Sequence, residues 1–163
     1  SFAKIVSPGL RVGYMVSPSH VQPRLAQCKQ STDFHTSNLS QRLIYEFCVR
    51  GYLGPHLEVI KKAYAEKRDV ALRAMEKYFP DGVKWTHPQG GLFVWATLPE
   101  EIDTTELIKR ASERKVAFIP GVPFYFDETG HNTMRLNFSN ASLDGLDEGL
   151  NRLGAVIKEA MDA

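Results

Sequence analysis

The segment from His56 to Tyr78 constrains the fold more than any other part of this sequence. It is rich in helix-forming residues and contains neither glycine nor proline. Its apolar residues recur at helical spacing and leave a wide charged face, which predicts one long helix. Pro80, Asp81 and Gly82 follow, and these residue types end a helix and favour a turn. A helix of this kind needs other elements to cover its apolar side.

Short strands and further helices follow the long helix. Apolar alternation and turn residues predict two strands within residues 83–98, joined by a turn at 87–91. Asp103 or Thr104 is predicted to cap the next helix. This order predicts an α+β fold, in which residues 51–163 form a small sheet covered by helices. The remaining predicted elements are a helix at 104–114, strands at 116–119 and 133–138, and a helix at 142–161.

Residues 1–50 form a separate group of predicted elements. Alternating apolar residues predict a strand at 10–16. Ser17 or Ser19 is predicted to cap a helix that begins near His20 and breaks at the polar residues 31–38. A second helix is predicted at 39–49. These residues lack a sheet of their own, so we expect them to be the tail of another domain.

Composition excludes several classes of function. Hydrophobic residues make up 43% of the chain and charged residues 24%, as in globular proteins. The formal net charge is +1 with acids and bases interspersed, which argues against a nucleic-acid partner. No apolar run reaches the roughly 18 residues of a spanning helix, so we expect no membrane partner. The two cysteines and five histidines show no ligand spacing, and we expect no metal.

Two basic residues near the start of the chain are candidates for chemistry. Lys4 lies in an apolar, turn-rich segment, and Arg11 follows seven residues later. Desolvation or a nearby cation activates an amine for attack on an aldehyde. A planar guanidinium can bind a phosphate through two hydrogen bonds, and the flanking Gly9 and Gly13 allow a close backbone approach.

A third candidate, Arg135, lies within the predicted strand at 133–138. Apolar residues flank it on both sides, as the sequence NTMRLNFS at 132–139 shows. Arginine is seldom buried unless it is paired, so we expect an anion to face it. That anion is either a ligand carboxylate, which suits a two-pronged guanidinium, or a structural acid such as Asp144.

Four segments together resemble the fold-type I aminotransferases that use pyridoxal 5′-phosphate, in classes I and II. They are SFAKIVSPGLRVGY at 1–14, QGGLFVW at 89–95, PG at 120–121 and NTMRLNFS at 132–139. The resemblance covers essentially the whole chain. It is strongest to the branch that contains the 2-aminoadipate, aromatic and kynurenine aminotransferases.

The resemblance implies a role for each candidate residue. Lys4 would hold the cofactor aldehyde covalently and then act as general base and acid. Arg11 would bind the cofactor phosphate, and Ser1 could add a hydroxyl, since Ala3 stands where the family usually has serine. Arg135 would clamp the α-carboxylate of the substrate. The stretch 36–38 is similar to a segment that approaches the active site of the neighbouring subunit.

The resemblance also implies how the chain is organised. Residues 1–50 would be the C-terminal remnant of the cofactor-binding large domain, and 51–163 the interdomain helix and small C-terminal domain. The full-length protein would be a cytoplasmic homodimer that transfers an amino group from an L-amino acid to a 2-oxo acid (EC 2.6.1.-). The groups that contact the cofactor ring would lie upstream of Ser1, so we expect the isolated chain to be inactive.

Two alternatives share the same lysine segment. One is another fold-type I enzyme that uses this cofactor, a lyase or a decarboxylase. The other is the aminotransferase-like effector domain of a transcription regulator, which would carry a basic winged helix upstream. The setting of Arg135 favours the aminotransferase over both.

Overall fold

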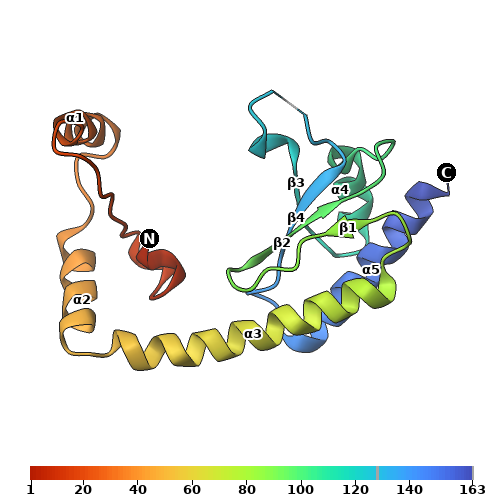
Figure 1. Cartoon of the computed structure of the whole chain (residues 1–163), viewed down its shortest axis with the longest axis horizontal. Helices are drawn as coiled ribbons and strands as arrows, with labels where there is room; N and C mark the ends of the chain where they lie inside the picture. The colour runs from red at the N-terminus through yellow and green to blue at the C-terminus, as the bar shows by residue number, and fades with distance from the viewer. Residues whose placement is uncertain (128, 163) are drawn as a thin grey trace. The chain divides into compact units, whose positions relative to one another are not determined.

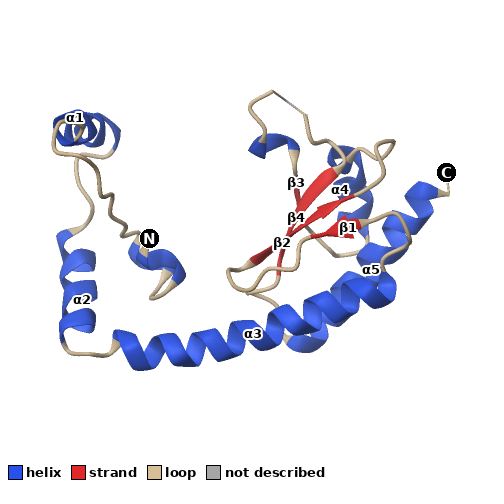
Figure 2. Ribbon diagram, viewed as in Figure 1, coloured by secondary structure: helices blue, strands red, loops and turns tan. Residues whose placement is uncertain are grey.

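The computed structural model describes residues 1–127 and 129–162. Five α-helices and four short strands make up most of this part of the chain (Figures 1 and 2). In chain order the elements are η1 (Phe2–Lys4), η2 (Pro8–Leu10), α1 (Gln22–Thr32), α2 (Asn38–Val49), α3 (Leu53–Tyr78), β1 (Lys84–Trp85), β2 (Phe93–Thr97), α4 (Thr104–Glu113), β3 (Ile119–Pro120), η3 (Val122–Phe124), β4 (Thr133–Asn137) and α5 (Leu143–Met161).

The chain divides into two compact units, Ser1–Lys61 and Lys62–Ala163. The division falls inside α3, so one continuous helix contributes residues to both units. No helix among the described residues combines the length and the apolar character that crossing a membrane requires.

The second unit is built on a four-stranded antiparallel sheet in the order β1-β2-β4-β3. The central pair sets Trp95 opposite Arg135 and Ala96 opposite Met134. Because side chains alternate along a strand, this register sorts the residues of β2 and β4 onto two faces. Val94, Ala96 and Met134 are buried on one face, whereas Trp95 and Arg135 lie on the other.

Helices α4 and α5 and the C-terminal part of α3 cover the buried face of the sheet (Figure 1). The predicted α+β class, a small sheet covered by helices, is therefore confirmed. Ser142 caps α5 and Asp103 caps α4, each accepting a hydrogen bond from a main-chain N–H of the first turn. The hydrogen bonds from Thr105 hold the pKa of Asp103 below its usual value. The fully buried large side chains are Phe138, Met75, Met134, Leu153, Ile157, Val94, Val156 and Thr104.

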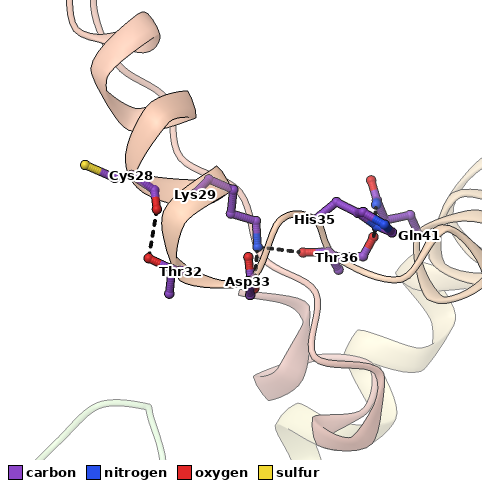
Figure 3. A network of polar contacts seen from close by, with 7 residues as sticks. All are labelled: Cys28, Lys29, Thr32, Asp33, His35, Thr36 and Gln41. Carbon is purple, nitrogen blue, oxygen red and sulfur yellow. Dashed lines mark hydrogen bonds and ion pairs between the residues drawn. The ribbon is translucent and has the colours of Figure 1, made fainter.

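In the first unit, hydrogen bonds of polar side chains stabilise the segment between α1 and α2 (Figure 3). Lys29 Nζ donates to Asp33 Oδ2 at 2.7 Å and to Thr36 Oγ1 at 3.2 Å. From the other side, Gln41 Nε2 donates to the carbonyl oxygen of Thr36 at 2.8 Å. Ser37 caps α2 through its hydroxyl. The polar residues that predicted a break thus hold its geometry.

The strand predicted at 10–16 is wrong. A 3-10 turn over Pro8–Leu10 ends at Arg11, whose left-handed backbone (φ 53°) cannot belong to a strand. Apart from one bond that Phe2 donates to Val12, no ladder forms there among the described residues. The alternation also fails as a burial pattern, because Tyr14 is 71% exposed and Val16 is 89% exposed.

Three element boundaries differ from the prediction by two residues or more. Helix α3 begins at Leu53 rather than His56. Its first turn includes Pro55, and proline is tolerated there because the N–H groups of a first turn have no helical partner. Helix α1 begins at Gln22 without a serine cap. Strand β3 starts at Ile119 rather than residue 116. Lys115 adopts φ 58° and Val116 donates to the carbonyl of Ala111, so this segment completes the end of α4 instead.

Two glycines of α5 allow a matched test of this packing. A Cβ at Gly149 would make one ordinary contact, 3.9 Å from Val116, beside an apolar cavity of about 140 Å³. A Cβ at Gly154 would collide with the carbonyl oxygen of Tyr78 and lie 2.9 Å from its carbonyl carbon. We expect Gly149→Ala to raise the free energy of unfolding by about 1 kcal/mol, the helix-propensity gain. Gly154→Ala should lower it by roughly 1–3 kcal/mol through overpacking. Denaturant unfolding measures both, and equal effects would contradict this packing.

Candidate functional site

The first thirteen residues fold back on themselves. The amide of Phe2 donates to the carbonyl of Val12 at 3.0 Å, which joins the two ends of the segment. Ser1 consequently lies beside Gly13, where a Cβ would sit 3.7 Å from the Cα of Ser1. The fold thereby places Ser1, Lys4 and Arg11 in one loop, and residues 1–13 are called the N-terminal loop below.

Lys4 and Arg11 are both exposed on the N-terminal loop. The guanidinium of Arg11 donates one hydrogen bond, from Nη1 to the carbonyl of Pro8 at 3.3 Å. Its backbone at φ 53° is unusual for a residue with a side chain, and such strain often marks a functional position. Ser1 Oγ accepts from the amide of Ala3 at 3.3 Å. The loop therefore presents an amine, a guanidinium and a hydroxyl, a set that suits an aldehyde bearing a phosphate.

Arg135 occupies the open face of the sheet in the second unit. It lies in the middle of β4, between Trp95 of β2 and Ile119 of β3. Its Nε is buried and has no hydrogen-bond partner among the described residues. None of the ion pairs in that part of the chain includes Arg135, so the pair with Asp144 that the sequence left open does not form there. The anion expected from the sequence is thus not supplied by a described residue.

Aromatic rings take the place of an acid around Arg135. The guanidinium carbon lies 4.2 Å from the ring centroid of Phe93 and 4.6 Å from that of Phe124. Neither ring was predicted to have this role, although the run of aromatic residues at 124–126 is a signal in the sequence. A hollow of about 320 Å³ adjoins the group, lined by Phe93, Ala117, Phe118, Ile119, Arg135 and Asn137.

Gly121 fixes the loop that carries Phe124. Its amide donates to the carbonyl of Thr133 at 2.7 Å, which ties the loop to β4. A Cβ at this position would collide with the Thr133 hydroxyl and lie 2.8 Å from the carbonyl oxygen of Gly130. The glycine is therefore required for close packing of the loop against β4. By contrast, a Cβ at Gly90 would meet open space.

The candidate residues fall into two groups. Ser1, Lys4 and Arg11 share the N-terminal loop of the first unit, whereas Arg135 belongs to the second unit, and each group is described by itself. Within residues 1–127 and 129–162, no cluster of three or more histidine, cysteine or acidic side chains could hold a metal ion.

Comparison with known proteins identifies the family to which this chain belongs. The family model described as Aminotransferase class I and II matches residues 1–153. This chain belongs to that family. It is 45% identical over 161 residues to an uncharacterised aminotransferase of Saccharolobus solfataricus, covering 99% of this chain and 40% of that protein. It is 43% identical over 161 residues to aromatic-amino-acid aminotransferase 1 of Thermococcus litoralis, covering 99% and 39%.

Solved structures agree with this assignment. The Pyrococcus horikoshii kynurenine aminotransferase superposes with a TM-score of 0.93 at 42% identity, covering 100% of this chain and 40% of that one. This chain therefore spans about 40% of the length of these relatives. It is also 34% identical over 161 residues to an HTH-type transcriptional regulator of Bacillus subtilis, covering 99% of this chain and 33% of the regulator.

The surroundings of Arg135 predict that it does not stabilise the fold. A buried donor without a partner costs about 1–3 kcal/mol. The aromatic contacts return about 0.5–2 kcal/mol, and a methionine would regain part of that through sulfur–aromatic contacts. We therefore expect Arg135→Met to leave the free energy of unfolding unchanged or to raise it, as measured by denaturant unfolding.

Lys67 provides the matched control for this substitution. Its Nζ donates to the carbonyl of Ser139 at 2.8 Å from a half-buried position. Lys67→Met should lower the free energy of unfolding by about 1 kcal/mol, because it leaves that carbonyl without its donor. If Arg135→Met were as destabilising as Lys67→Met, Arg135 would have a structural role.

Proposed function

We propose that this chain supplies the substrate-carboxylate arginine and the cofactor lysine of a pyridoxal-phosphate-dependent aminotransferase. The whole protein would transfer an amino group between an L-amino acid and a 2-oxo acid. The observation that carries the proposal is Arg135, a guanidinium on the open face of a sheet with no acid paired to it in the described residues. Membership of the aminotransferase family supports the same reading.

Arg135 would bind and orient the substrate. An α-carboxylate can accept two parallel hydrogen bonds from one guanidinium, which fixes its direction as well as its position. Both the amino acid and the 2-oxo acid carry this carboxylate, so one arginine serves both halves of the exchange. Fixing the carboxylate also fixes the Cα–H bond relative to the groups that act on it.

The N-terminal loop would hold pyridoxal 5′-phosphate. The amine of Lys4 would bind the aldehyde covalently, and Arg11 with the hydroxyl of Ser1 would bind the phosphate. The donor set on the loop fits this group, and a structural relative from Thermus thermophilus was solved with a phosphopyridoxyl-leucine adduct. When bound, the cofactor supplies an electron sink for the charge that develops at Cα. Once the amino group of the substrate has displaced Lys4 from the aldehyde, the freed amine would take the Cα proton as general base and deliver a proton to the cofactor carbon as general acid.

The remaining features of the whole protein follow from the resemblance. We propose a cytoplasmic homodimer with no nucleic-acid partner, in which residues 1–50 belong to the large domain and 51–163 to the interdomain helix and small domain. We also propose that the 163 residues alone do not catalyse transamination. The reason is that we expect none of the groups that contact the cofactor ring to come from these residues.

A regulator is the second candidate, favoured by the similarity to the Bacillus subtilis protein. In that case the chain would be an effector domain that binds an amino acid or the cofactor and transmits the binding to a DNA-binding domain. Exchange between glutamate and 2-oxoglutarate by the protein that carries this chain separates the two candidates. Steady turnover supports the enzyme, whereas cofactor binding without turnover supports the regulator.

The role of Lys4 predicts where the cofactor attaches. Reduction of the loaded protein with borohydride should fix the phosphopyridoxyl group on the peptide that contains Lys4, as found by peptide mass spectrometry. Lys4→Ala should abolish this attachment, because no other residue of the loop carries an amine side chain. Lys61→Ala is the matched control, since that lysine is exposed and pairs with Glu58. Attachment at another lysine would disprove the assigned role.

The role of Arg135 predicts a change in substrate affinity. Arg135→Met should raise KM for glutamate and for 2-oxoglutarate by about tenfold or more. This follows because each charge-assisted hydrogen bond contributes about 1.5–3 kcal/mol. The visible absorbance of the bound cofactor should stay unchanged. Arg110→Met removes only a surface pair with Glu159 and should leave KM unchanged. Equal KM values for Arg135→Met and the parent would refute the carboxylate role.

A further inference from the structure

The open face of the sheet holds a connected group of aromatic rings around Arg135. Phe93 and Trp95 come from β2, Phe124 from η3 and Arg135 from β4, so three chain segments meet there. Phe124 packs edge-on against Trp95, with 5.4 Å between ring centroids. Each ring is thus held by the sheet or by another ring, which makes the group a defined setting for the guanidinium.

The distances place the guanidinium under the influence of two rings. Its carbon lies 4.2 Å from the centroid of Phe93 and 4.6 Å from that of Phe124, well inside the roughly 6 Å limit for cation–π attraction. Phe93 is the diagonal neighbour of Arg135 across the β2–β4 pair. Phe124 is fixed by the amide that Gly121 donates to Thr133, and by its own amide, which donates to Gly121 at 2.8 Å.

An aromatic setting holds an arginine differently from an acid. An acid would accept the N–H groups of Arg135 and neutralise its charge. A ring attracts the cation through its π face, accepts none of the strong hydrogen bonds and brings no formal charge. The charge of the guanidinium is accordingly not compensated by an acid in the described structure, and its Nε keeps an N–H without an acceptor there.

We propose that Phe93 and Phe124 are positioning residues for Arg135. They hold its guanidinium in place without consuming its N–H groups, so that these groups stay free for the substrate carboxylate. This inference rests on the proposed function, because it assumes that Arg135 binds that carboxylate. Neither ring needs to touch the substrate for this role.

Leucine and tyrosine substitutions at Phe124 distinguish the effect of the aromatic ring from the effect of side-chain size. In the protein that carries this chain, Phe124→Leu should raise KM for glutamate and for 2-oxoglutarate by about three- to thirtyfold, the loss expected for one cation–π contact. The value of kcat should change less than about twofold, since binding is lost equally in ground and transition states. Phe124→Tyr keeps the ring and should restore the parent KM. Phe93→Leu should act like Phe124→Leu.

Phe126 gives a matched control from the same loop. It is fully exposed, and none of the aromatic or cation–π contacts of the described residues includes it. Phe126→Leu should therefore leave KM unchanged. In an Arg135→Met background, Phe124→Leu should have no further effect on KM, because the group that it positions is gone. Additive effects of these two substitutions would overturn the proposal.

A spectroscopic measurement tests the positioning without relying on activity. In ¹⁵N-labelled protein, the Nε–Hε signal of Arg135 is the one that disappears in Arg135→Met. It should be shifted by the ring currents of the parent protein, move part of the way toward an ordinary position in Phe124→Leu, where Phe93 remains, and stay in place in Phe126→Leu. Addition of 2-oxoglutarate should move it in the parent protein.

The outcomes distinguish the inference from the function on which it rests. If Arg135→Met leaves KM unchanged and 2-oxoglutarate does not move the signal, the carboxylate role fails, and the positioning role fails with it. If Arg135→Met raises KM but Phe124→Leu changes neither KM nor the signal, only the inference is overturned. A fall in kcat and thermal stability in Phe124→Leu, with KM unchanged, would also overturn it.

Discussion

The antiparallel pairing of β2 with β4 is the interaction on which the second unit depends. Its register sets Ala96 opposite Met134 on the buried face and Trp95 opposite Arg135 on the open face. A slip of one residue would exchange the two faces, burying the arginine under the helices and exposing the core. The same hydrogen bonds that build the core therefore also place the charge, and folding and recognition share one constraint.

Much of this arrangement could be predicted from local patterns. The turn at 87–91 and the apolar run after it predicted the pair β1–β2, and helical spacing predicted α3, α4 and α5. Asp103 was one of two predicted caps for α4, and it is the cap in the structure. These predictions succeed because spacing, caps and turn residues act within a few positions of the sequence. The lone arginine in an apolar strand was also recognisable, since such a residue needs an explanation.

The rest depends on contacts between distant residues. The aromatic setting of Arg135 joins Phe93 and Phe124, which no local pattern connects, and the guanidinium could have met Asp144 instead. The strand predicted at 10–16 does not form, although its pattern is local. Its alternation was real in the sequence, but a left-handed Arg11 and a turn at Pro8–Leu10 occupy its start. Alternation indicates a strand only where a partner strand accepts its hydrogen bonds.

Neither candidate arginine pairs with an acid within residues 1–127 and 129–162, unlike three other arginines of the second unit. Arg110, Arg114 and Arg152 each pair with a glutamate at the surface, which compensates their charge. Arg11 instead holds a left-handed backbone, a conformation that costs a residue with a side chain roughly 1–2 kcal/mol.

Arg135 keeps a buried donor without a partner in the described residues, at a cost of about 1–3 kcal/mol. Both positions thus have a local feature that lowers the stability of the folded chain, as is common where a protein binds a ligand. An anion at either arginine would add hydrogen bonds that the folded chain alone does not make. Because such an anion binds only the folded form, its binding would stabilise that form by mass action. The positions that weaken the free chain are thus those through which a bound anion would strengthen it.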